Sequence, residues 1–177
     1  MRNATGAGSP DVRGHVLQDE GTGLVGMSEV VRSSVSDYAG DVAPREAWRV
    51  LSENPRARLV DVRTRAEWTY VGLPDLGAIG GKPLLVEWQA FPDMALNTRF
   101  AAEADALVTG SGGTRDAPVF LLCRSGARSR AAAIALTGAG YAAAYNVADG
   151  FEGDHDAAGH RGTRSGWKAE GLPWRQG

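Results

Sequence analysis

The residues with the clearest chemical potential are the six from Cys123 to Arg128, which read Cys-Arg-Ser-Gly-Ala-Arg. Cys123 is the only cysteine of the chain, and Arg124 and Arg128 flank a short Ser-Gly-Ala turn. The apolar run at 119–122 predicts a buried strand before the cysteine, and the segment at 129–137 predicts a helix after it. Backbone N–H groups at a helix N-terminus lack partners, so a cysteine placed there is favoured as a thiolate and can hold an anion beside its sulfur.

The charges near this cysteine are all positive. No acidic residue occurs between Asp116 and Asp149, whereas that interval holds three arginines: Arg124, Arg128 and Arg130. Gly126 permits a tight turn with its N–H facing inward, and Ala127 is too small to block the ring. The loop is therefore predicted to form an anion-binding nest for a thiolate, a persulfide or an oxyanion substrate. Arg130 is expected to be a solvated helix residue.

Short apolar runs alternate with helical patterns along the rest of the chain. Strands are expected at 58–62, 84–86, 119–122 and 144–147. Further helices are expected after Pro44, after the capping-box pattern Thr64 to Glu67, and after Asn97, whose helix has an apolar side of Phe100, Ala104 and Leu107. This alternation predicts an α/β fold with a parallel sheet, in which active sites lie at the carboxyl ends of strands. Cys123 falls at such an end.

Length and composition limit the functional classes. The 177 residues fit one domain, expected at 35–177, behind an N-terminal tail at 1–34 that is rich in Gly, Ser and Asp. The net charge of −2 argues against nucleic-acid binding, and no run is long and apolar enough to span a membrane. A single cysteine cannot form an internal disulfide, which favours a reducing, cytoplasmic location. It also means that any group loaded on the sulfur must leave to an external acceptor.

Several separate motifs together resemble the rhodanese-type sulfurtransferases over most of residues 35–177. They are Leu59-Val60-Asp61-Val62-Arg63 with Glu67-Trp68, Val119 to Ser129 around the cysteine, Asn146-Val147, Gly150-Phe151-Glu152-Gly153, Gly166-Trp167-Lys168, and Gly171-Leu172-Pro173-Trp174. The resemblance implies a rhodanese-like fold, with a five-stranded parallel sheet flanked by helices on both faces. It also implies that the Cys123 thiolate takes a sulfane sulfur from a small anionic donor such as thiosulfate. An external thiol or another nucleophilic acceptor then removes the outer sulfur of the persulfide.

The same resemblance assigns roles within the loop without any metal or cofactor. Arg124 and Arg128 would hold the anionic donor, and the two arginines favour a doubly charged one such as thiosulfate. The backbone N–H groups of the following residues would hold the persulfide: Arg124, Ser125, Gly126, Ala127, Arg128 and Ser129. Cysteine is the most nucleophilic of the common catalytic side chains, in agreement with these roles.

Three segments depart from the family pattern. Many members have His-Ile-Pro-Gly-Ala after the first Asp-x-Arg, whereas residues 72–78 here contain no histidine. The stretch 154–165 is interpreted as an insertion, with the potential to extend a loop over the pocket and alter substrate choice. Residues 79–98 are also longer than a minimal member needs.

Other polar and aromatic residues have simpler structural interpretations. Asp61 and Arg63 are expected to form an internal ion pair, and Glu67 is explained by helix capping. His155, Asp156 and His160 lie among glycines without regular ligand spacing, which favours a solvated loop over a metal site. The aromatic side chains divide into two expected groups: Trp48, Trp68 and Trp167 in the core, and Trp88 and Phe151 as candidate pocket-lining residues.

Two other functions use the same residues. Cysteine phosphatases and arsenate reductases also hold a thiolate in a loop that ends in arginine, but with five intervening residues, whereas four separate Cys123 from Arg128. A shorter ring leaves less room for a tetrahedral oxyanion, and arsenate reduction usually needs a further thiol. A non-catalytic rhodanese-type binding module is the third hypothesis, and it requires a pocket that is closed to substrate.

Overall fold

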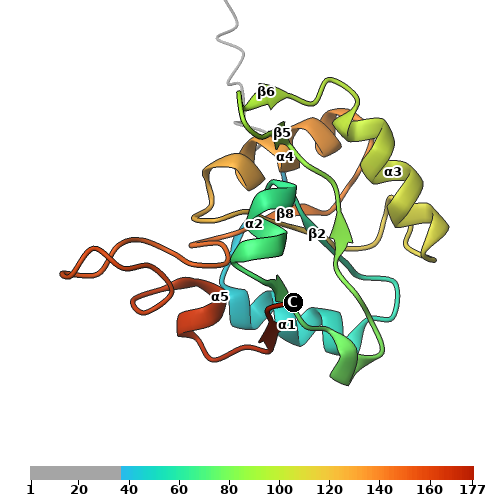
Figure 1. Ribbon diagram of the computed structural model, residues 1–177. Helices are drawn as coiled ribbons and strands as arrows, with labels where there is room; N and C mark the ends of the chain where they lie inside the picture. Colours follow the sequence, from blue (N-terminus) through green and yellow to red (C-terminus); the bar gives the residue numbers. More distant parts are fainter. Residues whose placement is uncertain (1–36) are drawn as a thin grey trace, which may run out of the picture. The chain divides into compact units, whose positions relative to one another are not determined.

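The computed structural model describes residues 37–177, and the predicted tail at 1–34 lies outside the described residues. Its central sheet has five parallel strands in the order β1-β8-β7-β2-β4 (Figure 1). The strands are β1 (Gly40–Val42), β2 (Arg58–Asp61), β4 (Leu84–Leu85), β7 (Val119–Leu122) and β8 (Ala144–Val147). The expected α/β architecture with a five-stranded parallel sheet is confirmed, and β7, which leads into Cys123, is the central strand.

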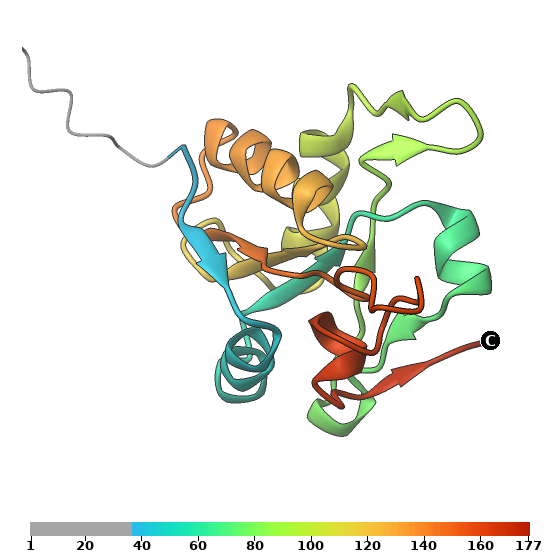
Figure 2. The same ribbon diagram turned by 90° about the vertical axis from the view of Figure 1, so that its left-hand side faces the viewer.

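Helices cover both faces of this sheet, as Figure 2 shows. On one face lie α3 (Phe100–Gly110) and α4 (Ala127–Gly138), and on the other lie α1 (Pro44–Glu53) and α5 (Gly166–Ala169). The side chains of β7 alternate between two apolar clusters: Leu121 packs with α3 and α4, whereas Leu122 packs with α1 and α5. Cys123 continues this alternation and belongs to the α3–α4 side.

Two small antiparallel pairs complete the described fold. β3 (Leu73–Pro74) pairs with β9 (Trp174–Arg175), and β5 (Gln89–Ala90) pairs with β6 (Ala95–Leu96). A short 3₁₀ helix, η1 (Gly77–Ile79), lies between β3 and β4. Part of the additional length at 79–98 therefore forms the β5–β6 hairpin. Within residues 37–177, no helix has the length and apolar character needed to cross a membrane.

The helix starts predicted from capping residues agree with the structure to different degrees. Helix α2 (Arg65–Tyr70) begins after Thr64, and the predicted capping box is complete: each side chain of the Thr64–Glu67 pair bonds the other's backbone N–H. Asn97 instead accepts from the N–H of Arg99, which is the cap residue of α3, so Asn97 closes the turn before that helix. Helix α4 begins at Ala127, two residues before the expected 129–137 segment.

Three details differ from the sequence predictions. Strand β1 was not expected, because its three residues include glycine and aspartate; it is held at the sheet edge by its pairing with β8. Leu107 is 42% exposed, and Val108 is buried in its place, together with the expected Phe100 and Ala104. Among the tryptophans expected in the core, Trp167 is buried, whereas Trp48 and Trp68 are only half-buried.

Candidate functional site

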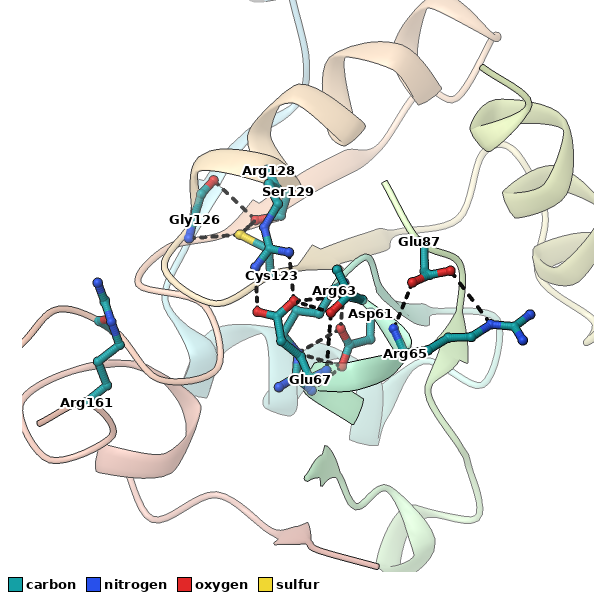
Figure 3. A network of polar contacts seen from close by, with 12 residues as sticks. Asp61, Arg63, Arg65, Glu67, Glu87, Cys123, Gly126, Arg128, Ser129 and Arg161 are labelled. Atoms are coloured by element: carbon teal, nitrogen blue, oxygen red, sulfur yellow. Dashed lines mark hydrogen bonds and ion pairs between the residues drawn. The ribbon is translucent and has the colours of Figure 1, made fainter. Parts of the chain in front are cut away.

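The Cys123 side chain lies at the carboxyl end of β7 and points into the turn that begins α4. Its Sγ atom accepts a hydrogen bond from the Gly126 N–H at 3.1 Å and lies 3.1 Å from the Ser129 hydroxyl. Figure 3 shows the sulfur directed at these two groups. Cys123 is only 1% exposed. The sulfur is thus buried and yet faces polar donors on its loop side.

Glycine at position 126 is what allows this turn. Gly126 is the cap residue of α4, with a φ of 100° that side chains strongly disfavour. In that conformation its N–H turns back toward the sulfur. Ser129 follows one helical turn later, fully buried, which brings its hydroxyl to the same sulfur. The short loop and the helix start therefore place both donors together.

The Ser129 hydroxyl has one proton and three possible acceptors. They are Cys123 Sγ at 3.1 Å, the Gly126 carbonyl at 3.2 Å and Asn146 Oδ1 at 2.6 Å. A single hydroxyl donates to one acceptor at a time. The sulfur and the Asn146 amide oxygen therefore compete for the same proton, and Asn146 has the shorter contact.

The orientation of the Asn146 amide is set from its other side. Its Nδ2 donates to the Asp41 carboxylate at 2.8 Å, and a carboxylate can only accept, so Oδ1 must face Ser129. The Tyr38 hydroxyl donates to the same carboxylate at 2.8 Å. This hydrogen bond to Asp41, together with burial, raises the pKa of Tyr38. No local pattern in the sequence predicts a role for Asn146 or Asp41, because their contact joins β1 to β8 across 105 residues of chain.

A second cluster lies at the mouth of the loop, where α2 meets α4. The Arg128 guanidinium donates two hydrogen bonds to the Glu67 carboxylate, at 2.8 and 2.7 Å (Figure 3). Burial raises the pKa of Glu67, but hydrogen bonds from Arg128 and Thr64 outweigh it and hold the pKa at about 2. The hydrogen bonds to Glu67 raise the pKa of Arg128. Glu67 therefore caps α2, as expected, and also holds the loop arginine.

The Glu67–Arg128 ion pair bears on the donor-binding roles predicted for the two loop arginines. Arg128 was expected to hold the anionic donor, but its two terminal nitrogens are directed at Glu67. Arg124 is exposed, and no ion pair or hydrogen bond of its guanidinium occurs within residues 37–177. Of the other predicted loop residues, Ser125 is half-buried and Ala127 is exposed, and only the Gly126 N–H reaches the sulfur. Arg130 is exposed, as expected.

A cavity of about 370 Å³ opens beside the loop. Its walls come from α2, from the residues joining β5 to β6, and from the loop itself: Thr64, Ala66, Glu67, Val71, Phe91, Met94, Arg124 and Arg128. None of these lining residues belongs to 154–165, so the β5–β6 hairpin, and not the proposed insertion, borders the pocket. Another cavity, of about 420 Å³, lies at the opposite end of β2 near Arg58 and is remote from the cysteine.

The two candidate pocket aromatics are packing residues. Phe151 is fully buried, with the Arg63 guanidinium 4.0 Å from its ring centroid. Trp88 packs edge-on against Phe100 at 5.1 Å. The Arg63 guanidinium also bonds Asp61 at 2.5 Å, with both side chains fully buried, which confirms the expected internal ion pair.

The histidine-containing loop is organised by a single carboxylate. Asp156 accepts from the N–H groups of Ala158 and His160 and from the Thr163 hydroxyl. These bonds lower the pKa of Asp156. Among the described residues, no group of three potential metal ligands occurs. The contacts account for this loop as a hydrogen-bonded surface turn.

Comparison with known proteins places this geometry in a family. Residues 39–177 match the family model of the STR4 middle domain. The crystal structure of Rv0390 from M. tuberculosis is 54% identical, with a TM-score of 0.70, covering 79% of this chain and 99% of that one. An uncharacterized protein of Rickettsia rickettsii is 38% identical over 135 residues, which are 76% of this chain and 96% of that protein.

More distant relatives have names that describe chemistry. The chloroplastic protein THYLAKOID RHODANESE-LIKE of Oryza sativa is 28% identical over 84% of this chain, but the match spans only 27% of that protein. The solution structure of the polysulfide-sulfur transferase homodimer from Wolinella succinogenes has a TM-score of 0.50 and 24% identity, covering 80% of each chain. That structural likeness supports the fold. From the family match over 39–177, this chain belongs to the STR4 middle domain family, with a rhodanese-like fold.

Proposed function

We propose that this protein is a sulfurtransferase that carries a sulfane sulfur on Cys123. The observation that carries the proposal is the position of Sγ, between the Gly126 N–H and the Ser129 hydroxyl at the start of α4. Both donors and the helix N-terminus stabilise negative charge on the sulfur or on a persulfide extending from it. The names of the rice and Wolinella proteins support the same reaction class.

The transfer has two balanced steps. The Cys123 thiolate attacks the outer sulfur of a donor such as thiosulfate; a Cys–S–S⁻ persulfide forms, the donor's S–S bond breaks, and sulfite leaves with the electron pair. A thiolate or cyanide acceptor then attacks the outer persulfide sulfur and regenerates the Cys123 thiolate. The chain's single cysteine requires that this acceptor be external. Arg124, exposed at the mouth, attracts the anionic donor.

Loading and discharge of the sulfur test this proposal directly. The purified protein is treated with thiosulfate, and intact mass measures the addition of one sulfur; cyanide should then remove it as thiocyanate. Cys123→Ser should abolish both signals while retaining the unfolding transition of the native protein. Thiocyanate formation by Cys123→Ser at the native rate would refute a Cys123 persulfide. Turnover of an aryl phosphate without sulfur loading would instead support the phosphatase alternative.

The burial of the sulfur gives one reason to keep the binding-module alternative. Cys123 is 1% exposed, and the cavity-lining residues include its neighbour Arg124 but not Cys123 itself. Alkylation of the folded protein distinguishes the two functions. A sulfurtransferase should react with a small alkylating agent under native conditions, whereas a closed module should react only after unfolding.

A further inference from the structure

The walls of the mouth cavity indicate which sulfur donor it suits, given the proposed function. Its two arginines are opposed by the Glu67 carboxylate, so two positive charges and one negative charge leave a single net positive charge. A donor with two negative charges, such as thiosulfate, would bring one more negative charge than these walls balance. The Glu67 pair thus weakens the preference for a doubly charged donor that two unpaired arginines would have given.

Four of the five remaining lining residues are apolar, and two of these are exposed to solvent. Phe91 is 66% exposed and Met94 is 38% exposed, both at the tip of the β5–β6 hairpin, opposite Ala66 and Val71 of the α2 segment. Met94 has a φ of 54°, in the left-handed region that non-glycine residues seldom occupy. Exposed apolar groups beside a cavity favour a ligand that covers them. A cavity of about 370 Å³ also has room for much more than a five-atom inorganic anion.

We infer that the preferred donor is an organic sulfur compound with one negative charge and an apolar body. Its outer sulfur would reach Cys123, its charge would be matched by Arg124, and its body would contact Phe91 and Met94. Organic thiosulfonates and organic persulfides share this chemistry. With a thiosulfonate, the Cys123 thiolate takes the outer sulfur, the S–S bond breaks, and a sulfinate leaves with the electron pair. With a persulfide, the leaving group is a thiolate.

Two thiosulfonates and two hairpin variants isolate the apolar contact. Benzenethiosulfonate and methanethiosulfonate carry the same charge and release similar sulfinates, but only the first has a ring to place against Phe91. Phe91→Ala should lower kcat/KM for benzenethiosulfonate about five- to tenfold, and that for methanethiosulfonate less than about twofold. Leu96→Ala is the matched control, because Leu96 is 54% exposed on the same hairpin but does not line the cavity. Equal losses for both donors, or the same loss in Leu96→Ala, would overturn the inference.

Glu67→Gln tests the charge argument in the opposite direction. Glutamine retains the capping-box geometry but removes the negative charge, so the net charge of the walls rises by one. The ratio of kcat/KM for thiosulfate to that for benzenethiosulfonate should rise about fivefold. An unchanged or lower ratio would contradict the charge argument. Comparing ratios within one donor pair removes the intrinsic difference between sulfite and sulfinate as leaving groups.

Two further controls separate the possible outcomes. Benzyl persulfide replaces benzenethiosulfonate in a parallel series. The donor whose rate falls in Phe91→Ala identifies which of the two classes, thiosulfonate or persulfide, the cavity binds. If neither rate falls, the inference is rejected. Intact mass is recorded throughout. If no donor adds sulfur to Cys123, the proposed sulfurtransferase function fails. If every donor adds sulfur at rates that Phe91→Ala leaves unchanged, the function stands and the donor class proposed here fails.

Discussion

The candidate site has two sides, a floor around the Cys123 sulfur and a rim around the cavity, and they are built in different ways. The floor consists of Cys123, Gly126, Ser129 and Asn146, and the rim consists of Glu67, Phe91, Met94, Arg124 and Arg128. All four floor residues are buried, and their groups meet through hydrogen bonds, whereas Phe91, Met94 and Arg124 of the rim are exposed. The floor is therefore suited to holding one atom in one place, and the rim to selecting among molecules that approach it.

The difference also concerns how each side is connected to the fold. Cys123, Gly126 and Ser129 span a single loop and helix start, so their relative positions follow from local geometry. The rim joins segments far apart in the sequence: Glu67 meets Arg128 across 61 residues. Changes in the floor should therefore affect the reaction with every donor alike, whereas changes in the rim should alter selectivity and pH dependence.

The largest loss of stability is expected at Gly150, whose backbone lies very close to that of Cys123 and Arg124. Gly150 has a φ of 59°, and a Cβ there would lie 2.7 Å from the Arg124 carbonyl oxygen and closer still to that of Cys123. Gly150→Ala should therefore reduce the free energy of unfolding by about 3 kcal/mol or more, measured by urea denaturation. Gly126→Ala is the comparison, because its Cβ would make only ordinary van der Waals contacts, with the nearest atom at 3.6 Å. Only backbone strain of about 1–2 kcal/mol is expected there. Equal costs would show that steric contact does not distinguish the two glycines.

The Glu67–Arg128 pair should make the rim a pH-dependent part of the fold. The pKa of Glu67 is about 2 in the folded protein, below its ordinary value of 4.5. Its ionised form therefore contributes stability above pH 4.5, and this contribution is lost as the pH falls from 4.5 toward 2. Both side chains are partly exposed, and screening by solvent limits the full loss of stability to about 2–3 kcal/mol. The difference in unfolding free energy between wild type and Glu67→Gln should shrink over this interval. A difference that stays constant would show that the pair does not contribute in this way.

The sequence predicts the parts of both sides that are local in the chain, but not the contacts that join them to distant segments. The apolar run before Cys123, the glycine after it and the capping box at Thr64 each act over a few residues, where spacing determines geometry. The link from Glu67 to Arg128 depends on where α2 packs against the start of α4, and no local pattern encodes that distance. For the same reason the sequence placed Phe151 in the pocket, where the structure has Phe91.

The exposed loops show the same limit. The family resemblance marks 154–165 as an insertion, and its distance from the pocket could be learned only from the fold. On helix α3, periodicity favoured Leu107 over Val108, yet the packing of the helix on the sheet buries the valine. A shift of the buried face by one residue is compatible with the same apolar pattern along the helix. The neighbouring elements therefore decide which face of α3 is buried.

Within the floor, the Ser129 hydroxyl should control the reactivity of the Cys123 sulfur. It is one of two donors to the sulfur, and a hydrogen bond to a charged group contributes about 1.5–3 kcal/mol. Ser129→Ala should therefore slow alkylation of native Cys123 at neutral pH by about tenfold, followed by intact mass against time. Ser125→Ala is the matched control: Ser125 is half-buried in the same loop, and no hydrogen bond of its hydroxyl to the sulfur occurs. If both variants slow the reaction alike, the loop as a whole sets the rate and the contact with Sγ does not.

The smallest effect is expected at the far end of the floor, where Asp41 orients the Asn146 amide. Asp41→Asn removes the carboxylate that fixes Nδ2, so the amide can turn and donate to Ser129, which releases the Ser129 proton for the sulfur. Alkylation of Cys123 should then become faster by about two- to threefold, in the opposite direction to Ser129→Ala. Loss of negative charge at Asp41 would also favour the thiolate, and the double variant separates the two causes. In a Ser129→Ala background, the acceleration by Asp41→Asn should disappear if it passes through the hydroxyl, and should persist unchanged if it is only the field of a distant charge.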